Sequence, residues 1–179
     1  ELVLSNFNGG VLVRYRIGDL FEVVSNGDEE IGSELPQMRF YSRSDDIIDL
    51  GSFLRLTERE ICKTIEASGL EYRDWVARKH IAEAYSTLHL YVELVKSGSI
   101  PEEKVQEMIR QSFSARFSDY NDMKEMLSIE PVIVTLIPSG AFAAYMKSKM
   151  EAGADLAHLK PPHMKPSDDI LMKLLNVPG

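Results

Sequence analysis

Three short segments of this 179-residue chain carry side chains that could bind a nucleotide or another anion. In the first, Asp19 follows Gly18 at the end of an expected strand, where its carboxylate could accept hydrogen bonds from both hydroxyls of a ribose. In the second, the polar cluster Arg43–Asp46 lies between two expected strands. In the third, Lys160 precedes two prolines, and its flexible ammonium could reach a phosphate or a carboxylate as a point charge.

Each of these segments also has an ordinary structural explanation. The run Arg14–Asp19 could be a strand with exposed arginines that ends in a turn, and Arg43–Asp46 could be a surface turn with local salt bridges. Lys160 could simply be solvated. From the residue types and spacing alone, both explanations stay open for each segment.

Short strands are expected to position the first two segments. Apolar runs bounded by glycine, asparagine or proline are typical of strands, and Asn8-Gly9-Gly10 is typical of a hairpin turn. Leu88 to Leu94 alternate with polar residues, which predicts a strand buried on one face only. The expected strands cover residues 1–7, 11–16, 20–24, 38–41, 47–50, 72–78, 88–94 and 132–137.

The sequence also predicts four helices. The capping-box spacing Thr57-Glu58-Arg59-Glu60 opens one that stops at Ser68-Gly69. The others start at Pro101, after Gly140 and at Ser167, and the third of the four is expected to turn Phe142, Met146 and Met150 inward. The segment from Ala157 to Pro166 has prolines and few apolar anchors, so we expect it to be mobile. This layout predicts an α+β fold, with small antiparallel sheets flanked by helices.

Charge and composition argue against several classes of protein. The net charge of −8 argues against nucleic-acid binding, which needs a basic face. No apolar run is long enough to span a bilayer and no secretory leader opens the chain, so we expect no membrane partner. The single cysteine, Cys62, rules out an internal disulfide and fits a cytoplasmic location. The four histidines stand at no ligand spacing from Cys62 or a carboxylate, so no metal site is expected.

The first residues, Glu1 to Phe7, read at once as a strand with no cap before it. Because a natural domain rarely begins inside a strand, we expect this chain to be the carboxy-terminal part of a larger protein.

The order of the segments resembles that of the adenylate-forming superfamily, which includes acyl-CoA synthetases and phenylacetate–CoA ligases. The run Tyr15-Arg16-Ile17-Gly18-Asp19 resembles the motif Tyr-Arg-x-Gly-Asp, and Arg43-Ser44-Asp45 stands where the Arg-x-Asp hinge is expected. The tail is similar to that of the auxin-responsive acyl-acid–amido synthetases of plants and their bacterial relatives, with phenylacetate–CoA ligase next closest. The matching tail residues are Gly140, Phe142, Met146, Gly153-Ala154 and Lys160-Pro161-Pro162.

The resemblance implies a role for individual residues. Tyr15, Asp19 and Arg43 would bind the nucleotide, with Asp19 on the ribose hydroxyls and Arg43 at the phosphate or ribose. Asp45 would be the hinge between the end of a large N-terminal domain, residues 1–44, and a mobile C-terminal domain, residues 45–179. Lys160 would be the mobile catalytic lysine that reaches the α-phosphate during adenylation.

The implied enzyme is an ATP-dependent ligase that activates a carboxylic acid as an acyl-adenylate and transfers it to an amine, such as an amino acid, or to CoA. ATP and Mg²⁺ would be required. The phosphate-gripping loop and acyl pocket would lie in the missing N-terminal domain, so this fragment alone should be inactive.

Some residues depart from the superfamily pattern. Ser42 replaces the usual glycine before the hinge, and Gly51–Leu56 does not match the loop that contributes to a CoA tunnel, which weakens the case for CoA. Lys165 is an alternative to Lys160 as the mobile lysine. A non-catalytic α+β binding or assembly module remains the alternative function.

Overall fold

The structure is a computed structural model that describes residues 1–44, 46–51, 53–82, 85–96, 98, 100–155 and 158–176. The chain forms two compact units, Glu1–Ile47 and Ile48–Gly179, which we call unit 1 and unit 2. No helix of the described residues is long and apolar enough to cross a membrane.

Unit 1 consists of two antiparallel strand pairs. β1 (Val3–Asn6) pairs with β2 (Leu12–Arg16), and β3 (Asp19–Ser25) pairs with β4 (Gln37–Arg43). The turn between β1 and β2 contains Gly9 and Gly10, both with positive φ, which glycine adopts without steric cost. The four strands expected in this part of the chain are therefore confirmed.

Unit 2 is built around a three-stranded sheet in the order β7-β8-β9. β7 and β8 are antiparallel, as expected for the small antiparallel sheets, whereas β9 pairs with the other edge of β8 in parallel. The crossover from β8 to β9 contains two helices. The elements of unit 2 are β5 (Ile48–Asp49), β6 (Arg55–Leu56), α1 (Glu58–Ala67), β7 (Tyr72–Ile81), β8 (Ser86–Leu94), α2 (Glu102–Arg116), α3 (Ser118–Leu127), β9 (Val132–Ile137), α4 (Ala141–Glu151) and α5 (Asp168–Leu175).

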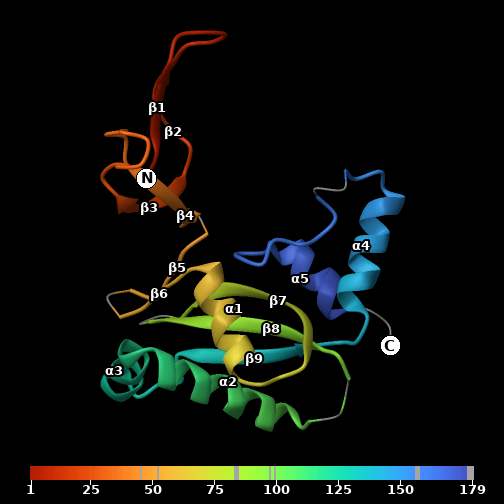
Figure 1. Ribbon diagram of the computed structural model, residues 1–179. Helices are drawn as coiled ribbons and strands as arrows, with labels where there is room; N and C mark the ends of the chain where they lie inside the picture. The colour runs from red at the N-terminus through yellow and green to blue at the C-terminus, as the bar shows by residue number, and fades with distance from the viewer. Residues whose placement is uncertain are drawn as a thin grey trace. The chain divides into compact units, whose positions relative to one another are not determined.

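Helices cover both faces of the unit 2 sheet (Figure 1). On one face α1 and α2 pack against Leu88, Leu90 and Val92 in the larger hydrophobic cluster. On the other, α4 and α5 pack against Val76, Tyr91 and Ile137 in a second cluster. The expectation that β8 is buried on one face only is therefore wrong, because α4 and α5 exclude water from the face that carries its more polar residues.

The helices follow their local sequence signals with two differences. The capping box of α1 is present: the Glu60 N–H donates to the Thr57 hydroxyl, and the Thr57 N–H donates to the Glu60 carboxylate. In α4 the inward-facing residues are Phe142 and Tyr145, whereas Met150 is 56% exposed, so the expected inward position of Met150 is wrong. α3 was not expected from the sequence. The α+β fold class is confirmed.

Candidate functional site

The β3–β4 pair brings Asp19 and Arg43 together in unit 1. Asp19 opens β3 and Arg43 closes β4, and the antiparallel register places them opposite one another. The distance from Arg43 Nε to Asp19 Oδ1 is 3.9 Å. Gly18 has a φ of 83°, and its carbonyl accepts a hydrogen bond of 2.7 Å from the Ser44 N–H. Two of the three expected nucleotide-binding residues thus share one strand end.

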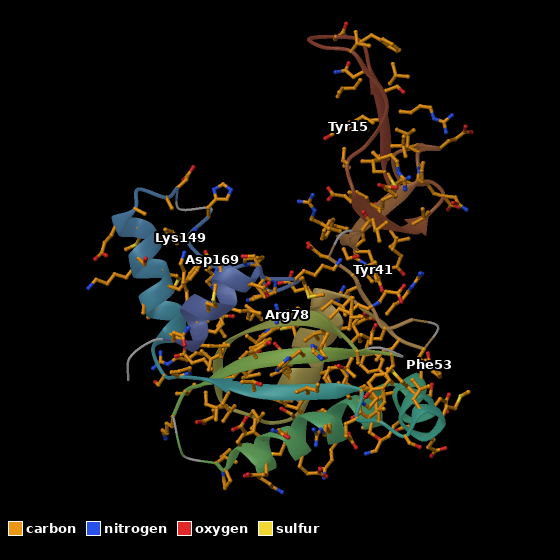
Figure 2. All side chains as sticks on the ribbon, turned by 180° about the vertical axis from the view of Figure 1, so that it is seen from behind. Tyr15, Tyr41, Phe53, Arg78, Lys149 and Asp169 are labelled. Atoms are coloured by element: carbon orange, nitrogen blue, oxygen red, sulfur yellow. The ribbon has the colours of Figure 1, made fainter. Side chains whose placement is uncertain are left out.

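The other two expected residues of this region are placed differently. Tyr15 lies on β2, on the extended β1–β2 hairpin, with a side chain that is 51% exposed (Figure 2). Asp45, the expected hinge, lies outside the described residues.

Lys160 belongs to a segment of unit 2 that docks along β7 before α5 begins (Figure 1). The Ala77 N–H donates to the His163 carbonyl and the Lys165 N–H donates to the Ala77 carbonyl, each at 2.7 Å. Between them Met164 is only 4% exposed and joins the larger hydrophobic cluster. The expectation that this segment has few apolar anchors is therefore wrong, because Met164 and a short parallel bridge fix it to the sheet.

His163 lies at the centre of a charged cluster that no sequence pattern indicated. Its Nδ1 is 2.5 Å from Glu58 Oε1 and its Nε2 is 2.8 Å from Asp74 Oδ1. Its ring stacks on Trp75, with the centroids 4.7 Å apart and the planes at 16°. Sequence spacing showed no carboxylate near this histidine, because the fold brings Glu58 and Asp74 to it from 105 and 89 residues away.

Lys160 is the fourth charged residue of this cluster. Its Nζ is 3.5 Å from Asp74 Oδ2, and its side chain is 67% exposed. We call Glu58, Asp74, Lys160 and His163 the Asp74 cluster. The alternative lysine, Lys165, is exposed and lies five residues further on, with a φ of 52°.

The pKa values of the two central groups are shifted in opposite directions. Burial lowers the pKa of His163, but hydrogen bonds with Asp74 and Glu58 more than offset this, so the pKa lies above its ordinary value. Burial acts to raise the pKa of Asp74, but the hydrogen bond and charge of His163 hold it below its ordinary value. The pairing is therefore strongest above the lowered pKa of Asp74, and it is lost as pH rises through the raised pKa of His163.

No group of three or more histidine, cysteine or acidic side chains in the described part of the chain is arranged to hold a metal ion. The arrangement instead offers an acidic group beside an arginine in unit 1, and in unit 2 an exposed lysine on a fixed segment.

The model of the GH3 family C-terminal domain matches residues 54–168, which include all four residues of the Asp74 cluster. The chain belongs to the GH3 family. This membership confirms the family that the tail residues were expected to indicate. Tyr15, Asp19 and Arg43 lie before the matched GH3 region, and the expected likeness to phenylacetate–CoA ligases stays a prediction.

Solved structures agree with this membership at the level of the fold. A GH3.15 acyl acid amido synthetase is similar with a TM-score of 0.66 at 19% identity, over 92% of this chain and 31% of that one. The AtGH3.15 acyl acid amido synthetase in complex with 2,4-DB is similar with a TM-score of 0.61 at 19% identity, over 92% of this chain and 30% of that one. This chain therefore spans about a third of the length of these relatives. No curated protein sequence matches it.

Proposed function

We propose that this chain is the C-terminal part of an ATP-dependent ligase that forms an acyl-adenylate and transfers the acyl group to an amine. The observation that carries the proposal is the match of the GH3 family C-terminal domain to residues 54–168. The similar solved structures are acyl acid amido synthetases, which favours an amino acid over CoA as the acceptor. ATP would enter with Mg²⁺, as a substrate bound mainly by residues outside this chain.

In this proposal unit 1 completes the nucleotide site. The Asp19 carboxylate accepts hydrogen bonds from the ribose hydroxyls, and Arg43 beside it supports the ribose or phosphate. Tyr15 borders the same nucleotide from β2. The exposed apolar side chains of unit 1, including Phe7 and Val11, fit a surface that the rest of a larger domain covers.

Unit 2 supplies the mobile lysine in the same proposal. Rotation about Asp45 brings Lys160 to the α-phosphate, where negative charge develops during adenylation. The exposure of the Lys160 side chain and its long contact with Asp74, 3.5 Å, support this role, because the ammonium can exchange partners at small cost. This chain alone would be inactive.

The proposal is tested by ATP–pyrophosphate exchange in the full-length ligase. Lys160→Ala should lower the adenylation rate roughly 10²–10³-fold, comparable to the loss of one oxyanion donor, while transfer from a preformed acyl-adenylate stays nearly intact. Lys104→Ala removes an exposed lysine of α2 and serves as the matched control. A loss in Lys165→Ala but not in Lys160→Ala would move the assignment by five residues.

Asp19 is tested separately by calorimetry with ATP. Asp19→Ala should weaken ATP binding through the loss of two charge-assisted hydrogen bonds, each about 1.5–3 kcal/mol. Glu29→Ala, at an exposed acidic residue of the β3–β4 loop, is the control. Unchanged ATP affinity in Asp19→Ala would remove the ribose role.

A further inference from the structure

His163 stands three residues after Lys160, and both of its ring nitrogens face carboxylate oxygens of other elements. Nδ1 faces Glu58 of α1 at 2.5 Å, and Nε2 faces Asp74 of β7 at 2.8 Å. An ionised carboxylate can only accept hydrogen bonds, so both ring nitrogens must donate and the imidazole must carry its second proton. The stacked Trp75 ring adds a π-face, which also favours a cation.

The charge on His163 decides how firmly Asp74 holds Lys160. Asp74 Oδ1 accepts hydrogen bonds from His163 Nε2 and from the Trp75 N–H, at 2.8 and 3.0 Å. Lys160 approaches the other oxygen, Oδ2, at the longer distance of 3.5 Å. With His163 charged, the two carboxylates and two cations of the Asp74 cluster balance. With His163 uncharged, the Asp74 cluster keeps one cation, Lys160, for its two carboxylates.

We propose that His163 is a positioning residue for Lys160: its cation fixes the segment to Glu58 and Asp74, and by neutralising Asp74 it leaves the Lys160 ammonium loosely held. The importance of this for adenylation rests on the function proposed above. The interaction of Asp74 with Lys160 does not depend on that function, because it follows from the contacts within unit 2.

The charge relationship gives a pH dependence with a defined sign. The charged groups that face His163 are Glu58 from α1 and Asp74 from β7, and Lys160 of its own segment faces Asp74. Because the pKa of His163 is raised above 6.5, the cation is present below that value and lost as pH rises through the raised pKa. Adenylation by the wild-type ligase should fall over this pH interval, and the fall should be absent in His163→Gln.

Nuclear magnetic resonance of the 179-residue chain tests the hold on Lys160 without any activity. The ring ¹⁵N shifts of His163 should report two protonated nitrogens at pH 6. In His163→Gln the Lys160 ammonium should exchange its protons more slowly than in the wild type, because Asp74 then holds it more firmly. His80→Gln, at an exposed histidine of β7, is the control. A neutral His163 at pH 6, or unchanged Lys160 signals in His163→Gln, would overturn the proposal.

Half-reaction assays in the full-length ligase test the consequence. His163→Gln should slow ATP–pyrophosphate exchange about tenfold, because Lys160 must leave a stronger partner, with little change in transfer from a preformed acyl-adenylate. Adding Asp74→Asn to His163→Gln should restore most of the exchange rate. Equal losses in both half-reactions, or no restoration, would overturn the proposal. Full adenylation by Lys160→Ala would instead reject the proposed function, and the proton exchange of the Lys160 ammonium would then decide the role of His163.

Discussion

The two units of this chain differ in what holds them together. Every buried hydrophobic side chain among the described residues lies in unit 2, in clusters on both faces of the β7-β8-β9 sheet. In unit 1 the apolar side chains of Phe7 and Val11 are 71% and 73% exposed. A two-stranded sheet without a packed face is at best marginally stable in water. We therefore attribute the stability of this chain to the hydrophobic core of unit 2. Unit 1 exposes apolar surface that a further packing partner would have to bury.

The largest expected contrast comes from removing one phenylalanine from each unit. Phe113 of α2 is fully buried and stacks near Phe117 and Tyr120, so Phe113→Ala should lower the unfolding free energy of unit 2 by about 3–5 kcal/mol. Phe7→Ala should change it by less than about 0.5 kcal/mol. Urea unfolding followed by Trp75, the single tryptophan and a buried residue of unit 2, measures both.

A large destabilisation by Phe7→Ala would contradict this comparison. If Phe7→Ala shifted the Trp75 transition as far as Phe113→Ala does, the core of unit 2 would depend on unit 1, and the stability could not be assigned to one unit.

The second test concerns a buried charge that ties α4 to β8. The Glu93 side chain is fully buried, and its carboxylate accepts hydrogen bonds from the N–H groups of Gly140 and Phe142 at 2.7 and 3.0 Å. Such a carboxylate satisfies donors that the start of a helix leaves unpaired and complements the helix dipole. Glu93→Ala leaves both donors without their acceptor and should lower the unfolding free energy by about 2–3 kcal/mol.

The matched control for Glu93 is Glu125→Ala, which removes an exposed glutamate of α3. Amide exchange at Gly140 and Phe142 provides the local readout, since both N–H groups should exchange faster in Glu93→Ala. Unchanged exchange at these two amides would mean that Glu93 does not hold the start of α4.

A smaller effect is expected at the start of α1. The Thr57 hydroxyl accepts the Glu60 N–H at 3.3 Å, which completes one half of the capping box. Thr57→Ala should lower the unfolding free energy of unit 2 by about 1 kcal/mol, while Thr57→Ser, which keeps the hydroxyl, should lower it by a few tenths at most. Equal losses in the two variants would assign the effect to the threonine methyl group rather than to the cap.

Features set by neighbouring residues could be predicted from the sequence. The Asn8–Gly10 turn predicted the β1–β2 hairpin, and Thr57 with Glu60 predicted the first residue of α1, because both signals act over two to four residues. The side-by-side placement of Asp19 and Arg43 follows from the register of β3 and β4. The motifs that contain Asp19 and Arg43 could be recognised in the sequence, whereas the 3.9 Å distance between their side chains could be seen only in the structure.

Features set by distant packing could not be predicted in this way. Glu93 lies among alternating residues of β8, so its side chain was expected on a polar, solvated face, and only the arrival of α4 over that face buries it. His163 is the second example, because its partners are 89 and 105 residues away in the chain. Met164 is the third, since its neighbours in sequence gave no sign that it would enter the core. In each case a long-range contact overrides the local pattern.

The smallest expected effect is the deletion of residues 1–47, and it is the most direct test of the comparison between the units. If the core of unit 2 stabilises itself, the chain 48–179 should unfold with the same urea midpoint and slope as the 179-residue chain, within about 0.5 kcal/mol. A peptide of residues 1–47 should show little protected backbone by amide exchange, because its strand pairs bury no hydrophobic side chain. A lower midpoint for 48–179, or a protected 1–47 peptide, would each contradict the assignment of stability to unit 2 alone.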